Sequence, residues 1–158
     1  MAKPTKLQHR TARRFSRGFS LIELLTTVVI AGFLAAIAYP AYTNYITDSR
    51  RSTDGQGAVM ELAARLQKFH TACGVYHATI VGGALNDCSG LGLSTADSRG
   101  LNYTLSVTLT LAGAGYTIDA TPIGNQLARD TDCGTLSFTN AGVKTRSGSG
   151  PIERCWRN

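Results

Sequence analysis

The chain has 158 residues, which suits one domain with a modest core, and its formal net charge is +6. The whole surplus lies in residues 1–18, which carry six basic side chains and no acid: Lys3, Lys6, Arg10, Arg13, Arg14 and Arg17. Residues 19–158 hold ten basic and ten acidic residues and are formally neutral. The basic pI is therefore poor evidence for a nucleic-acid-binding protein. The leader indicates a cytoplasmic anchor beside a membrane segment.

A long apolar segment follows the leader, from Phe19 to Pro40. Its 22 residues would form a helix about 33 Å long, which matches the roughly 30 Å hydrocarbon core of a bilayer. We therefore expect a transmembrane helix over residues 19–40. The alternative is an ordinary signal peptide, because residues 35–38 resemble a small-residue cleavage site, but a signal peptide would have a shorter apolar region.

Glu23 is the only charged residue between Phe19 and Pro40. A charge inside a membrane costs on the order of 3 kcal/mol. We therefore expect Glu23 to have a function that offsets this cost, and assembly with other subunits is favoured over catalysis. The alternative is a carboxylate at a helix start, where the helix dipole contributes less than about 1 kcal/mol. The two roles are compatible.

The helix is expected to continue to about Thr71. Pro40 removes one backbone donor and predicts a kink or a locally melted turn. Beyond it, apolar residues at helical spacing predict a half-buried amphipathic helix: Val59, Leu62, Ala63, Leu66 and Phe69. The polar positions are assigned to Arg51, Asp54, Glu61, Arg65 and Lys68. Gly55 and Gly57 mark a weak point, since glycine in a helix costs about 1 kcal/mol relative to alanine.

The C-terminal half predicts an antiparallel sheet. Residues 82–100 are rich in Gly, Ser, Asn and Asp and indicate a loop. Strands are expected at residues 101–111, 116–120, 136–138 and 143–145. The first strand alternates strictly, with one apolar face made of Leu101, Tyr103, Leu105, Val107, Leu109 and Leu111. A long N-terminal helix whose second half covers four such strands is an α+β fold.

All four cysteines follow the apolar segment, which indicates an oxidising compartment such as the periplasm. Four cysteines allow three pairings. We favour Cys73–Cys88 and Cys133–Cys155 because both close local loops, and each would contribute about 3 kcal/mol in the chain-entropy model.

Catalytic and metal sites find little support in the sequence. His70, Cys73 and His77 lie close together, but their spacing fits no familiar zinc pattern. No Gly-x-Ser-x-Gly elbow occurs, and no Gly-Lys-Ser/Thr follows the glycines at residues 90–92. We therefore expect no enzyme, cofactor or metal, and a membrane-attached periplasmic enzyme is the weaker alternative.

The run Gly-Phe-Ser-Leu-Ile-Glu-Leu at residues 18–24, with the basic leader before it and Gly32 and Pro40 after it, resembles the type IV pilin signature. The resemblance covers roughly residues 13–65. It implies that a prepilin peptidase removes the leader, residues 1–18, by cutting between Gly18 and Phe19, and then methylates the new amine of Phe19.

The same resemblance implies that residues 19–40 form the transmembrane and assembly half of the helix. Residues 41–158 would form a globular domain in the periplasm while the subunit waits in the bacterial inner membrane. An assembly platform would then move the subunit into an extracellular helical fibre of pilins. There Glu23 would pair with the Phe19 amine of a neighbouring subunit, and this charge-assisted pair would set the axial register. Pro40 is counted with the assembly residues.

The C-terminal half is similar to the minor pilins related to PilE and to the DNA-uptake receptor ComP. The similarity rests on residues 115–118, 132–136, 140–144 and 155–156. It implies a subunit needed for pilus assembly, twitching motility or adhesion. A DNA-uptake receptor and a type II secretion pseudopilin are the alternatives, although the chain has no loop of spaced acids that would bind calcium.

Basic residues near the C-terminus are the candidate DNA contacts. Against Glu153 they leave a local surplus of three charges, and they are Lys144, Arg146, Arg154 and Arg157. Trp156 could stack on a base. We favour a Trp156 that fills the core beside Cys155, as aromatic residues do in small domains.

Overall fold

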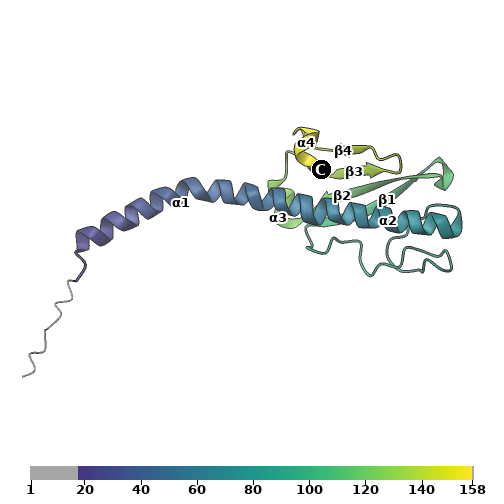
Figure 1. The fold of residues 1–158 in the computed structure, drawn as a ribbon, viewed down its shortest axis with the longest axis horizontal. Helices are drawn as coiled ribbons and strands as arrows, with labels where there is room; N and C mark the ends of the chain where they lie inside the picture. Colours follow the sequence, from purple (N-terminus) through teal and green to yellow (C-terminus); the bar gives the residue numbers. More distant parts are fainter. Residues whose placement is uncertain (1–17, 158) are drawn as a thin grey trace, which may run out of the picture. The chain divides into compact units, whose positions relative to one another are not determined.

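The computed structural model describes residues 18–157 (Figure 1). The chain divides into two compact units, and the boundary falls between Tyr39 and Pro40. Of the expected leader, only Gly18 lies within the described residues.

Helix α1 runs from Leu21 to Arg50 and passes through Pro40 in helical conformation. The melted turn expected at Pro40 is therefore absent from this helix. Proline removes a single backbone donor, and the neighbouring turns of a long helix keep theirs. Just beyond the proline, the hydroxyl of Thr43 donates to the Pro40 carbonyl at 3.0 Å.

The departure from α-helix comes later, at a single π-helical turn, η1, over Arg51–Gly55. Helix α2 then runs from Gln56 to Cys73, close to the expected end, and stops at Gly74, whose φ of 78° suits glycine. The π turn packs closely against Tyr103 because residue 55 is a glycine. A Cβ added at Gly55 would lie 2.9 Å from the Tyr103 ring. The other glycine of the segment, Gly57, has open space around it.

Four antiparallel strands form one sheet in the order β1-β2-β3-β4, as predicted. Their bounds are Tyr103–Thr110, Gly115–Pro122, Leu136–Thr139 and Lys144–Arg146. A short 3-10 turn, η2, spans Leu111–Gly113. Two short helices, α3 (Gly124–Arg129) and α4 (Ile152–Cys155), escape sequence analysis because they are too short to show a period.

The apolar face predicted for the first strand is only partly buried. Strand β1 begins at Tyr103, because Leu101 has a φ of 53° and is 67% exposed in the loop before it. Tyr103 and Leu105 are buried, whereas Leu109 is exposed. The prediction of an apolar face starting at Leu101 was therefore wrong, since alternation alone does not show where the covering layer ends.

The core lies between helix α2 and the sheet, both in the second unit (Figure 1). The apolar stripe predicted for this helix is confirmed, because all of its members are buried: Val59, Leu62, Ala63, Leu66 and Phe69. The sheet contributes Tyr103, Leu105, Tyr116, Ile118, Ala120 and Leu136. Each large apolar side chain buried in this way contributes roughly 1.5–3 kcal/mol.

Candidate assembly site

The start of helix α1 holds the residues of the predicted assembly motif. Gly18, Phe19 and Ser20 precede the helix, and the Ser20 carbonyl accepts the backbone N–H groups of Glu23 and Leu24 at 3.1 Å. Phe19 is 80% exposed. Glu23 lies in the first helical turn and is exposed. Within residues 18–157 no ion-pair partner reaches the Glu23 carboxylate, so it is accessible to a group from another chain.

The apolar part of α1 is exposed along its whole length. Every side chain from residue 18 to residue 42 faces solvent in the isolated chain, including large ones such as Leu21, Val28 and Phe33. Among the described residues, one helix is long and apolar enough to cross a membrane, and it contains this segment. An exposed apolar surface of this size marks a site for lipid or for other protein chains.

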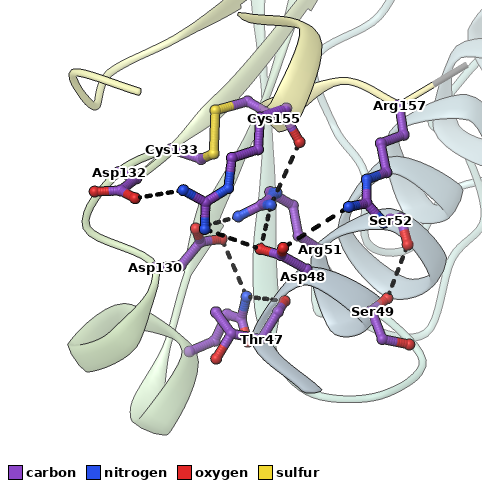
Figure 2. A network of polar contacts seen from close by, with 12 residues as sticks. Thr47, Asp48, Ser49, Arg51, Ser52, Asp130, Asp132, Cys133, Cys155 and Arg157 are labelled. Atoms are coloured by element: carbon purple, nitrogen blue, oxygen red, sulfur yellow. Dashed lines mark hydrogen bonds and ion pairs between the residues drawn. A yellow bond between two sulfur atoms is a disulfide. The ribbon is translucent and has the colours of Figure 1, made fainter. Parts of the chain in front are cut away.

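A buried ion pair joins the end of this long helix to the C-terminal half of the chain. The Arg51 side chain is 2% exposed and donates from Nη1 to Asp130 Oδ1 at 2.5 Å and from Nη2 to Asp48 Oδ1 at 2.6 Å (Figure 2). The sequence assigned Arg51 to the polar positions of the amphipathic helix, but its side chain is buried with the core. Its main partner lies 79 positions away, where helical spacing carries no information.

Two further side chains complete the pairing of Asp130. The Tyr103 hydroxyl and the Gln126 amide donate to Asp130 Oδ2 at 3.0 and 3.1 Å. Gln126 also donates to the Thr47 carbonyl of α1 at 3.0 Å. We call Arg51, Tyr103, Gln126 and Asp130 the buried polar cluster. Burial raises the pKa of Tyr103 well above its ordinary range, and the Asp130 charge raises it further, so the phenol stays protonated and can donate.

The segment at Cys155 and Trp156 is held to the globular unit by hydrogen bonds to main-chain carbonyl groups and by a disulfide. The Cys155 carbonyl accepts from Gln56 Nε2 at 2.7 Å, and Cys155 is joined to Cys133 (Figure 2). Trp156 is 4% exposed and donates from Nε1 to the Thr145 carbonyl at 2.8 Å. Trp156 therefore fills the core, as favoured from the sequence, and its ring is not available to stack on a base.

The second disulfide joins Cys73, at the end of α2, to Cys88 in the following loop. Because Cys73 is bonded to sulfur, it cannot serve as a thiolate ligand with the nearby histidines. His70 stacks on Tyr76, and His77 accepts a backbone N–H from Thr79 at 3.0 Å. Within the part of the chain that the structure describes, no group of three or more His, Cys, Asp or Glu side chains could hold a metal.

Two of the four candidate DNA contacts are engaged with carboxylates. Arg154 lies 2.9 Å from Asp132 and 3.7 Å from Asp48. Arg157 lies 3.9 Å from Asp48. The other two, Lys144 and Arg146, lie on strand β4, with the Lys144 ammonium 5.6 Å from the ring centre of Trp156.

Asp54, at the π turn, holds the loop that leads into β1, a role that sequence reasoning missed. Its carboxylate accepts from Ser98 Oγ at 2.7 Å, from the Gly100 N–H at 2.8 Å and from Asn102 Nδ2 at 2.9 Å. Burial of Asp54 raises its pKa, but the hydrogen bonds from Asn102, Gly100 and Ser98 together outweigh burial and hold the pKa below its ordinary value. The acid is therefore ionised at neutral pH and anchors the loop.

Two models of known protein families match consecutive parts of this chain. A family model described as "Type IV minor pilin ComP, DNA uptake sequence receptor" matches residues 40–137, which is more than half of the chain. A model of the prokaryotic N-terminal methylation motif matches residues 13–39.

Individual proteins are similar over most of the chain. Fimbrial protein Q of Moraxella bovis is 33% identical over 150 residues, which cover 90% of this chain and 92% of that protein. Fimbrial protein EcpC of Eikenella corrodens is 32% identical over 132 residues, which cover 80% and 75%. A solved type IV pilin from Shewanella oneidensis has a TM-score of 0.48 and 22% identity, over 71% of this chain and 99% of that one. The chain therefore belongs to the type IV pilin family, and it is a pilus structural subunit of the minor-pilin kind.

Proposed function

We propose that residues 19–40 anchor this minor pilin in the inner membrane, with residues 41–158 in the periplasm, until it enters the fibre. The observation that carries the proposal is an apolar helix that no other described residue covers, with one carboxylate, Glu23, that has no ion-pair partner among residues 18–157. Such a helix is stable in lipid, where its backbone bonds are satisfied internally, or against other helices of its kind. The basic leader on one side and the two disulfides on the other support this orientation.

Processing by a prepilin peptidase would occur between Gly18 and Phe19. Both residues are exposed and lie before the first helical turn, so an enzyme could reach this bond. Cleavage would create a new amine on Phe19, which methylation would leave positively charged.

The new amine supplies the partner that Glu23 lacks. A carboxylate and an amine that lose water together in the fibre core stabilise each other only when they meet at hydrogen-bonding distance. A pair between the Phe19 amine of one subunit and Glu23 of its neighbour would therefore favour one axial register over others. This pairing explains why a charge stands in a segment where charge is costly.

The test is incorporation of a Glu23→Gln variant into fibres, measured as the amount of this subunit in sheared pili relative to the amount in the membrane. We expect a loss of at least tenfold on the scale of one charge-assisted bond, about 1.5–3 kcal/mol. Thr26→Ala is the matched control, because Thr26 is exposed on the same helix and its hydroxyl bonds only the Glu23 carbonyl.

Normal incorporation of Glu23→Gln would contradict the docking role. The cleavage is tested separately by mass spectrometry of the mature N-terminus. An intact leader in cells that contain the peptidase would contradict processing at Gly18.

DNA binding is a second candidate function, favoured by the description of the matching family model as a DNA uptake sequence receptor. That match ends at residue 137, before all four candidate contacts. Lys144 and Arg146 lie together on the short strand β4, so this strand is the part of the candidate surface that we test for phosphate binding.

The test is the salt dependence of duplex DNA binding by the full chain in neutral detergent. Replacing both β4 cations by glutamine should reduce the slope of log affinity against log salt by about two. Arg99→Gln, at an 87% exposed arginine of the loop before β1, is the control. If no salt-dependent binding occurs at low ionic strength, this candidate function is wrong.

A further inference from the structure

Three aspartates of the second unit, gathered around Arg51 and Arg154, are already paired with arginines. Asp130 pairs with Arg51, and Asp132 pairs with Arg154 at 2.9 Å. Asp48 accepts from Arg51 at 2.6 Å (Figure 2). It also lies 3.7 Å from Arg154. Arg129, at the end of α3, lines a hollow with all three aspartates, but among residues 18–157 it forms no ion pair with them.

Two other arginines of the same region have no such partner. Among residues 18–157, no carboxylate forms an ion pair with Arg50, at the end of α1, or with Arg129, at the end of α3. Both line one hollow of about 180 Å³, together with Tyr42, Ile46 and the side chain of Asn125. No described carboxylate lines this hollow, so its charged lining residues are the two arginines.

The position of the hollow along α1 indicates where it lies relative to a bilayer. The apolar segment ends at Pro40, and the helical wall of the hollow extends from Tyr42 to Arg50, or from about 3 Å to about 15 Å farther along the helix. The headgroup layer of a bilayer extends about 5–8 Å beyond the hydrocarbon on each side. Helical side chains also tilt toward the N-terminus, which brings Arg50 closer to the membrane.

Exposed tyrosines support this placement. Tyr42 and Tyr45 are 64% and 69% exposed on the helical turns just beyond Pro40. Tyrosine is enriched at the membrane–water interface, where its ring contacts apolar groups and its hydroxyl stays hydrated. If the apolar segment spans the membrane, the helical wall near Tyr42 would therefore lie within the headgroup layer, and the long side chain of Arg50 would have to reach back toward it.

We propose that this hollow binds the phosphate of an anionic phospholipid headgroup while the subunit waits in the membrane. The inference rests on the membrane anchoring described above and goes beyond it by naming a lipid site on the globular unit. Guanidinium groups donate paired hydrogen bonds to phosphate oxygens, and the exposed Asn125 amide adds a donor. The volume equals that of about six liquid waters, which leaves room for a phosphodiester group. Lipid is favoured over DNA because Tyr42, which lines the hollow, follows the end of the apolar segment at Pro40 by only two residues in the sequence.

The test is native mass spectrometry of the full chain in neutral detergent, titrated with phosphatidylglycerol and with phosphatidylcholine of the same acyl chains. Each arginine near the lipid surface should contribute about fivefold in affinity. We therefore expect Arg50→Gln/Arg129→Gln to weaken phosphatidylglycerol binding about 30-fold, close to the level of phosphatidylcholine. Arg50→Lys/Arg129→Lys should retain most of the preference.

The matched control is Arg65→Gln/Arg99→Gln, which removes the same charge from arginines that face Glu61. The proposal is overturned if this control loses as much affinity, if the Arg50/Arg129 variant keeps its lipid preference, or if inorganic phosphate binds as tightly as the lipid. It is also overturned if the variant loses affinity for duplex DNA and not for lipid. Co-flotation of the variants with neutral vesicles tests membrane anchoring by itself, so its failure is distinguishable from failure of the lipid site.

Discussion

The guanidinium of Arg51 lies 2.5 Å from the carboxylate of Asp130, although 79 positions separate the two residues. Arg51 is 2% exposed and Asp130 is 1% exposed. The pair links the π turn between α1 and α2 to the loop after α3. The pair therefore joins the helical part of the second unit to its C-terminal half through a buried ionic contact.

Breaking this pair should destabilise the globular unit strongly. Arg51→Met leaves Asp130 buried with only the neutral donors Tyr103 and Gln126, and removing one partner of a buried ion pair typically costs about 3–5 kcal/mol. The measurement is denaturant unfolding of the full chain in detergent, followed by the fluorescence of Trp156, the single tryptophan.

Two further variants separate charge burial from packing. Arg99→Gln breaks an exposed pair and should change the free energy of unfolding by less than about 1 kcal/mol. Arg51→Met/Asp130→Leu removes both charges and should recover much of the loss. If Arg51→Met is no less stable than Arg99→Gln, the buried polar cluster does not stabilise the fold.

Gly55 and Gly57 offer a matched pair of helix substitutions with opposite expected signs. Gly55→Ala places a methyl group 2.9 Å from the Tyr103 ring and should cost about 1–3 kcal/mol through overpacking. Gly57→Ala enters open space and should stabilise by about 0.5–1 kcal/mol through helix propensity. Unfolding midpoints of the two variants check this, and equal shifts of the same sign would refute the close approach at Gly55.

Asp54 should make stability depend on acid pH. Its pKa is lower in the folded state than the ordinary value of 3.8, so the unfolded chain takes up the proton first as the pH falls. The contribution is therefore complete above about pH 5 and is lost as the pH falls below about 4. Asp54→Asn should be less stable than the wild type at pH 6 and should lose less on acidification. Parallel losses between pH 6 and pH 3 in both proteins would count against this role.

The two disulfides should contribute differently to the stability of the fold, although they close loops of similar length. Their sequence separations are 15 and 22, so the chain-entropy model assigns each about 3 kcal/mol. Cys133 and Cys155 are completely buried, and the Cys155 carbonyl also binds Gln56. Cys133→Ala/Cys155→Ala should therefore lose more stability than Cys73→Ala/Cys88→Ala.

The fluorescence of Trp156 under native conditions should distinguish the two double-cysteine variants. Only loss of the Cys133–Cys155 bond should expose the indole and shift its emission to the red, because Trp156 directly follows Cys155. Equal losses of stability without a shift would show that the C-terminus is held by packing alone.

Local patterns were sufficient for the regular parts of the globular unit. The spacing of Val59, Leu62 and Leu66 identified the buried face of α2, and alternation identified β1 and β2. These predictions succeed because each depends on neighbours within one element. The extent of burial along β1 was less predictable, since Leu101 and Leu109 satisfy the alternation but lie outside the covered area.

The assembly motif could be identified from the sequence because its residues, 18–24, are consecutive. A single charge in an apolar segment can likewise be recognised without knowledge of the fold. The sequence by itself therefore determined the membrane-length helix, the isolated Glu23 and the α+β order of elements. Only the tertiary structure decided that Arg51 is a core residue, that Asp130 is its partner and that Arg50 and Arg129 share one hollow. The physical reason is that ion pairing and burial depend on distance in space, and chain folding brings together charges that no sequence period relates.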